Sequence, residues 1–249
     1  MLNVEIGASV GRRVLKKLYP DEKFTFASFK DTTREYDTWV FRCKAKGSTS
    51  SLVCKLSTPD DIGRARIKNQ FDCLISANRN AEAGLFSVPK AIAFFEQDCT
   101  MIMEYVEGVS LRDKLGSFPN LSDAVAELTS AGRWIAAFQH PTRRDAEFEP
   151  KSHTNTLIRK MQSHREGKII IPAFDSFQSC FQLLEGLALK ARGQPCLRCV
   201  THRDFHAGNL VVRSDGSVVG IDFENLKEDE ALRDVMSFFF DMAIRWRGA

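Results

Sequence analysis

Three oxygen-bearing side chains, Asp204, Asn209 and Asp222, could together perform chemistry. Two apolar runs, 210–212 and 218–221, flank an Asp-Gly pair, and this pattern predicts a β-hairpin. The hairpin returns Asp222 to Asn209 and to the loop that carries Asp204. Phosphoryl transfer needs such a cluster, because Mg²⁺ takes oxygen ligands and a separate carboxylate must orient the attacking hydroxyl. The spacing therefore predicts one compact oxygen cluster that is suited to this reaction.

The order His202-Arg203-Asp204, then Asn209, then Asp222 at a strand end is the catalytic-loop arrangement of protein kinases. The full wording His-Arg-Asp-Phe-His-Ala-Gly-Asn-Leu-Val-Val more closely resembles the aminoglycoside phosphotransferase and choline kinase family. That family shares the kinase-like fold and mostly phosphorylates small molecules. The resemblance implies Asp204 as the catalytic base, Asn209 and Asp222 as metal ligands, ATP and Mg²⁺ as cofactors, and a small-molecule hydroxyl as acceptor.

A lysine at the end of a strand is the expected partner of the nucleotide phosphates. Alternating apolar residues predict an antiparallel meander with strands at 24–26, 39–43 and 51–56. Lys55 ends the third strand, where kinase-like folds keep the lysine that holds the α and β phosphates. The apolar face of the predicted helix 61–78 carries Gln70 where a glutamate is expected to pair with this lysine. If Gln70 takes that role, Lys55 gains a neutral hydrogen bond, which is weaker than a charge-assisted one.

Residues 101–115 resemble the kinase hinge, and the resemblance implies that backbone groups of Glu104 and Val106 bind the adenine edge. Two further strands are predicted at 87–96 and 99–106. Five predicted strands and the predicted helix 61–78 therefore precede Gly108.

These patterns predict an α+β, two-lobed protein kinase-like fold. Residues 1–107 would form a nucleotide-binding lobe, a five-stranded antiparallel sheet with one helix. Residues 108–249 would form a mainly helical lobe with the catalytic loop and the acceptor site. Apolar periodicity predicts its helices at 121–140, 154–166, 175–192 and 235–246. The resemblance also implies that Asp234 braces the catalytic loop.

Composition places the chain among globular proteins, with 249 residues, 43% hydrophobic residues and a formal net charge of +3. The apolar runs are too short to span a bilayer and the first residues lack a signal-peptide pattern, so we expect a cytoplasmic protein. Its small positive excess is spread along the chain and does not favour nucleic-acid binding. A basic helical face within 1–20 is more typical of a solvated surface than of lipid or nucleic-acid binding.

Cysteine usage indicates reduced thiols, because seven cysteines lie mostly in apolar surroundings. Cys196 and Cys199, with His202 three residues later, leave open a zinc site, although a structural site wants four ligands.

The sequence departs from the kinase-like pattern in two further ways, and these keep other interpretations of its function open. Residues 28–38 contain no glycine, so a Gly-rich phosphate lid is absent and only backbone amides or Thr32, Thr33 and Thr38 remain to reach phosphate. The chain ends 27 residues after Asp222, which resembles lipopolysaccharide-core sugar kinases or small atypical protein kinases. Together with Gln70, the missing glycines also allow a nucleotide-binding pseudokinase.

Overall fold

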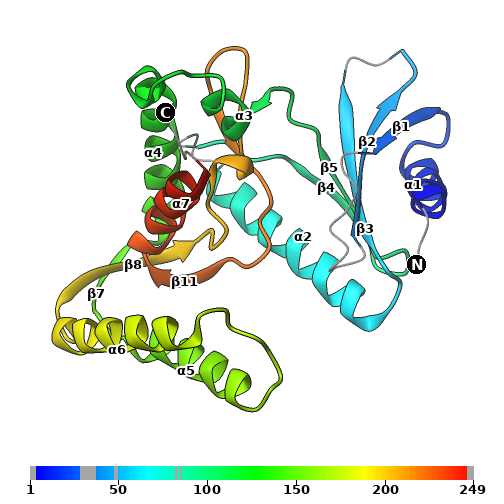
Figure 1. The fold of residues 1–249 in the computed structure, drawn as a ribbon. Coiled ribbons are helices and arrows are strands. Elements are labelled where there is room, and N and C mark those ends of the chain that lie inside the picture. The colour runs from blue at the N-terminus through cyan, green and yellow to red at the C-terminus, as the bar shows by residue number, and fades with distance from the viewer. Residues whose placement is uncertain (1–3, 29–37, 48–49, 82–83, 85, 246–249) are drawn as a thin grey trace.

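A five-stranded antiparallel sheet forms the N-terminal half of the computed structural model, which describes residues 4–28, 38–47, 50–81, 84 and 86–245. The strand order is β1-β2-β3-β5-β4, so β3 lies at the centre (Figure 1). The elements in chain order are α1 (Val4–Leu18), β1 (Phe24–Ser28), β2 (Thr38–Ala45), β3 (Ser51–Ser57), α2 (Asp61–Ala81), β4 (Ala91–Phe95) and β5 (Thr100–Glu104).

The two helices cover opposite faces of this sheet (Figure 1). Side chains alternate between the faces of a strand, so Cys54 and Leu56 of β3 join the apolar cluster that α1 closes with Val14 and Leu15. Lys55 therefore points to the other face, opposite Met101 of β5, where α2 packs. The alternation places a single lysine on the α2 side of the central strand.

The C-terminal half combines helices with two small antiparallel sheets, ordered β10-β9-β6 and β11-β8-β7. Its elements are β6 (Val109–Ser110), α3 (Leu111–Leu115), η1 (Leu121–Ala124), α4 (Val125–Gln139), η2 (His140–Thr142), β7 (Arg144–Glu147), α5 (Lys151–Arg165), α6 (Phe174–Ala191), β8 (Pro195–Thr201), η3 (Ala207–Asn209), β9 (Leu210–Val212), β10 (Val218–Gly220), β11 (Lys227–Glu230) and α7 (Leu232–Arg245). Helices α5 and α6 form a hairpin that extends from the β7–β8 sheet (Figure 1).

An aromatic stack around Trp134 forms the core next to the loop of residues 202–209. The Trp134 ring is nearly parallel to those of Phe138 and Phe205, with centroids 5.2 and 5.9 Å away. Its indole nitrogen donates a hydrogen bond of 2.9 Å to the carbonyl of Ser87, which satisfies the buried polar atom. This stack joins α4 to the loop that carries Asp204.

The predicted two-lobed α+β fold is confirmed, including the five-stranded sheet and the hairpin of residues 210–212 and 218–220. The sheet formed by β7, β8 and β11, and the short strand β6, were not predicted. Among the described residues, no helix is both long enough and apolar enough to cross a membrane.

Candidate active site

One buried carboxylate from α7 holds the backbone that leads into Asp204. Asp234 is fully buried, and its two oxygens accept hydrogen bonds from the backbone N–H groups of His202 at 2.9 Å and Arg203 at 2.8 Å. Arg203 has a φ of 67°, a left-handed conformation that is unfavourable for a residue with a side chain. The two hydrogen bonds stabilise this turn. The bracing role expected for Asp234 is confirmed in its geometry.

Asp204 and Asn209 are joined directly. The Asn209 side-chain nitrogen donates to the carbonyl of Asp204 at 2.9 Å and to its carboxylate at 3.0 Å. Both acceptors lack a hydrogen, so this orientation of the Asn209 amide is the only one that makes hydrogen bonds. The Oδ1 atom of Asn209 is therefore the one that can bind a cation. The side chain of Asp204 is exposed, as contact with an incoming hydroxyl requires.

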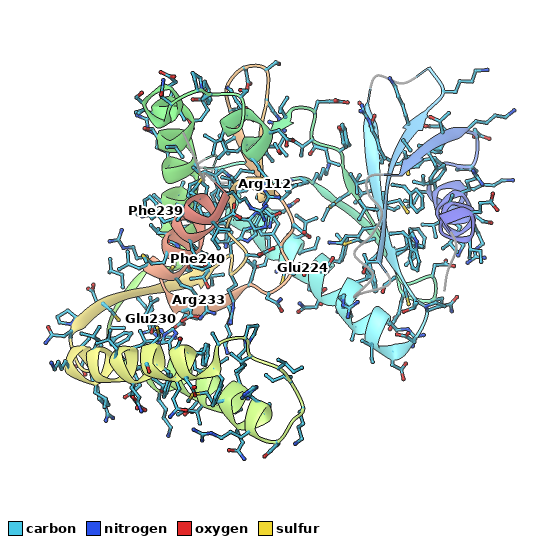
Figure 2. The ribbon with its side chains drawn as sticks, in the orientation of Figure 1. Arg112, Glu224, Glu230, Arg233, Phe239 and Phe240 are labelled. Atoms are coloured by element: carbon cyan, nitrogen blue, oxygen red, sulfur yellow. The ribbon has the colours of Figure 1, made fainter. Side chains whose placement is uncertain are left out.

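His206 lies beside the same carboxylate. Its Nε2 is 3.7 Å from Oδ2 of Asp204, while its Nδ1 accepts a 3.0 Å hydrogen bond from the backbone of Gly208. Arg112, at the start of α3, lies 3.2 Å from the same Nδ1 (Figure 2). These contacts anchor the catalytic loop to α3. Neither residue was predicted to belong to the site, although both lie inside the recognised motifs: His206 within residues 202–212 and Arg112 within residues 101–115.

Asp222 follows the hairpin, as predicted, and meets the N-terminal sheet. The N–H of Ile221 donates to the carbonyl of Asn209 at 2.9 Å, which brings the two proposed metal ligands to adjacent positions. Asp222 itself has a left-handed φ of 66°. Its Oδ1 lies 2.7 Å from the Nζ of Lys55. The predicted convergence of Lys55 and Asp222 is therefore present in the structure.

Electrostatics keep both members of this pair charged. Burial by itself lowers the pKa of Lys55, but the negative charges of Asp222 and Glu224 outweigh it, and the pKa is raised. Burial by itself raises the pKa of Asp222, yet Lys55 reverses the effect and holds the pKa below its ordinary value. At neutral pH the site therefore presents one ammonium facing carboxylates.

We expected Gln70 to form a hydrogen bond with Lys55, but its side chain bonds to Glu224 instead. Its side-chain nitrogen donates to Oε1 of Glu224 at 2.6 Å, and the same oxygen lies 3.3 Å from the Nζ of Lys55. The hydrogen bond predicted between Gln70 and Lys55 is thus replaced by a bridge through Glu224. Glu224 was not predicted to belong to the site. Its position directly after the Asp222-Phe223 pair was the sequence signal that could have identified it. A small pocket beside this bridge is lined by Lys55, Gln70, Leu74, Pro89, Met101, Met103, Asp222 and Phe223.

The proposed adenine-binding segment continues β5. The N–H of Glu104 donates to the carbonyl of Lys90 at 2.9 Å, so this N–H is already engaged, and Val106 lies two residues further on. Arg42 of β2 covers this segment: its guanidinium lies 4.0 Å from the ring centroid of Tyr105 and pairs with Glu107. The contacts of Arg42 with Tyr105 and Glu107 were missed because these two partners are more than 60 residues away in sequence.

The structure gives less support to the other candidate residues, which are the threonines of 28–38 and the possible zinc ligands. Residues 29–37, including Thr32 and Thr33, lie outside the described part of the chain, whereas Thr38 begins β2. Cys199 is buried in β8, where desolvation raises its pKa to about 11. Among the described residues, the side chains that lie close enough together to hold a metal ion do not include Cys196, Cys199 or His202. His202 instead uses Nε2 to bond the carbonyl of Ile221 at 3.0 Å.

His153, Asp229 and Glu230 are close enough to share a metal ion. However, Arg233 lies 2.7 Å from Asp229 and Arg198 lies 3.3 Å from Glu230, so arginines already neutralise both carboxylates. Figure 2 shows Glu230 and Arg233 at the junction of β11 with the α5–α6 hairpin. We interpret this cluster as an ionic link that holds α5 against β11.

The fold and the cluster around Asp204 and Asp222 define a kinase-like phosphotransferase. The chain belongs to the phosphotransferase enzyme family, whose model matches residues 35–249. A search of curated proteins gave no match.

Solved structures share the fold at low sequence identity. The ternary complex of APH(2″)-IIa with streptomycin and ATP has a TM-score of 0.59 at 15% identity, covering 94% of this chain and 75% of that one. The ethanolamine kinase of Plasmodium vivax has a TM-score of 0.60 at 16% identity, with 97% and 68% covered. Choline kinase LicA from Streptococcus pneumoniae has a TM-score of 0.59 at 17% identity, with 96% and 72% covered. At these identities the likeness establishes the fold.

Proposed function

We propose that this protein transfers the γ-phosphoryl group of ATP to a hydroxyl of a small molecule. The observation that carries the proposal is the 2.7 Å ion pair between Lys55 and Asp222, next to the hydrogen-bonded pair of Asp204 and Asn209. Catalysis of phosphoryl transfer is mostly positioning and charge stabilisation, which is what such a constellation provides. The family, and neighbours that are named as an aminoglycoside phosphotransferase, an ethanolamine kinase and a choline kinase, support a small-molecule acceptor.

Each residue has a distinct task in this proposal. Asp204 accepts the proton of the acceptor hydroxyl and aims its oxygen at the phosphorus. Lys55 binds the α and β phosphates, and the backbone of Glu104 and Val106 binds the adenine edge. Asn209 and Asp222 would hold Mg²⁺, and the fit is good, because the Asn209 amide nitrogen is committed to Asp204 and its oxygen remains as a hard ligand. Bound Mg²⁺ would neutralise the phosphate charge.

A pseudokinase is the rival interpretation, since α2 carries Gln70 where a glutamate is typical of active kinases. Such a protein would bind nucleotide without transferring phosphate. A protein or lipopolysaccharide-core sugar acceptor would keep the chemistry and change only the second substrate. The acceptor depends on pocket shape, so the motifs do not decide between these alternatives.

An acceptor screen with ATP that carries a labelled γ-phosphate tests the proposal. The panels would contain aminoglycosides, choline and ethanolamine, sugars including lipopolysaccharide core, and a protein mixture. We expect label on one small-molecule class, reduced about 10²- to 10⁴-fold in Asp204→Ala, the range typical for a lost general base. The control is Asp145→Ala, which removes an exposed carboxylate from β7. Equal transfer by wild type and Asp204→Ala would refute the catalytic assignment, and nucleotide binding without any transfer would favour the pseudokinase.

A further inference from the structure

Glu224 lies between the strand lysine and the helix that lacks a glutamate. Its Oε1 is shared by Nζ of Lys55 at 3.3 Å and by the side-chain nitrogen of Gln70 at 2.6 Å. In Figure 2, Glu224 lies beside α2, on the segment that follows β10. One carboxylate oxygen therefore links β3, α2 and the segment after Asp222.

The chemistry of Gln70 fits this link in one orientation. A carboxylate offers only acceptors, so the Gln70 side chain must present its NH₂ group to Glu224. The Oε1 atom of Gln70 is then buried without a hydrogen-bond partner among the described residues. A buried polar atom without a partner is unfavourable, so the hydrogen bond to Glu224 is the interaction that offsets it. A glutamate at position 70 would instead bring two carboxylates within 2.6 Å.

A second contact from the neighbouring residue reinforces the same link. The side-chain nitrogen of Asn69 donates to the backbone carbonyl of Glu224. Two consecutive residues of α2 thus hold both the backbone and the side chain of Glu224. This makes the position of Glu224 depend on α2 rather than on its own rotamer preference.

We propose that Glu224 is the positioning residue that supplies the negative charge for Lys55, and that Gln70 holds Glu224 in place. The inference rests on the proposed function, because Lys55 matters as a phosphate ligand there. An ammonium has three N–H groups, and Asp222 and Glu224 engage two of them. The two engaged N–H groups fix the orientation of the ammonium and therefore the direction of its third N–H group. This third group is the one that reaches the nucleotide. The missing helix glutamate is therefore replaced by a carboxylate from the C-terminal half of the chain.

An exchange of the two side chains tests this pairing. Glu224→Gln removes the charge next to Lys55, and Gln70→Glu places two carboxylates together. Each single variant is expected to raise the KM for MgATP about tenfold, equivalent to about 1.4 kcal/mol, with a smaller change in kcat. The double variant, Gln70→Glu with Glu224→Gln, restores one charge and one amide and is expected to return KM to within about threefold of wild type. Asp72→Asn, an exposed carboxylate on the same helix, is the control for general charge effects.

Binding of MgADP and urea unfolding are measured on the same variants. If wild type binds MgADP and Lys55→Ala does not, while both single variants bind like wild type, the role of Glu224 is refuted and the proposed function stands. If wild type binds no nucleotide, the proposed function fails. The unfolding cycle then decides the pairing alone: a favourable coupling between positions 70 and 224 supports it, and a coupling near zero overturns it.

Discussion

The ammonium of Lys55 lies 2.7 Å from the carboxylate of Asp222, although 167 residues separate them in the sequence. Lys55 comes from the central strand of the N-terminal sheet, and Asp222 follows the hairpin of the other half. The ion pair is therefore the direct contact between the proposed phosphate-binding and metal-binding groups. Its partners also determine what each substitution in the site should do.

Replacing Lys55 by Met should abolish most of the activity. The change removes the cation that we propose to bind the phosphates, and it leaves Asp222 without this partner. We expect kcat/KM for ATP to fall about 10²- to 10³-fold, as for loss of one preorganised electrostatic donor. Steady-state kinetics measure this, with Lys68→Met on the exposed face of α2 as the control. An undiminished kcat/KM would show that Lys55 does not bind phosphate.

Asp234→Asn should weaken the catalytic loop without touching substrate. The amide keeps one acceptor oxygen, so one of the two backbone N–H groups, of His202 or Arg203, loses its hydrogen bond in a buried site. An unsatisfied buried donor costs about 1–3 kcal/mol. We expect that decrease in the free energy of urea unfolding together with a lower kcat. Asp21→Asn, at an exposed turn, should change neither quantity.

Stability should fall between neutral and mildly acidic pH because of His202. Desolvation lowers the pKa of this histidine against the opposing effect of Asp234, and its Nδ1 is buried without a hydrogen-bond partner among the described residues. The folded state therefore holds His202 neutral when the unfolded state, with a pKa of about 6.5, already binds a proton. Since the unfolded state binds more protons there, the free energy of unfolding rises with pH.

Urea unfolding at a series of pH values from about 5 to about 8 measures this slope. The His202→Gln variant should be less stable at neutral pH and should have a shallower slope across this window. His140→Gln, which changes an exposed histidine, should retain the wild-type slope. An identical slope in wild type and His202→Gln would contradict the assignment.

Gly220→Ala should destabilise the fold. A methyl group at this position of β10 would lie 2.0 Å from the ring of Trp134, which is already stacked between Phe138 and Phe205. Overpacking of a core typically costs about 1–3 kcal/mol. Thermal unfolding should therefore show a lower Tm. Gly186→Ala, on α6 with no atom near the new methyl, should instead raise the Tm slightly, because alanine favours helix.

Local patterns allowed much of the fold to be predicted. The hairpin at 210–220 follows from its Asp-Gly turn, and α2 follows from a helical apolar period. By contrast, β11 consists of Lys227–Glu230, four charged residues that strand propensity disfavours. It pairs with β8, and Glu230 lies opposite Arg198 and forms an ion pair with it. Such a strand is stabilised by a distant partner and cannot be recognised from its own residues.

The sequence by itself determined which residues we propose to carry the chemistry, because Asp204, Asn209 and Asp222 lie in one short motif with a predictable turn. It also identified Lys55 through its position in a regular strand. Only the tertiary structure decided how that lysine is held: Glu224 pairs with it, and Gln70, 154 residues earlier, holds Glu224. The physical reason is that hydrogen bonds and ion pairs depend on distances in space, which spacing along the chain does not specify when the partners belong to different lobes.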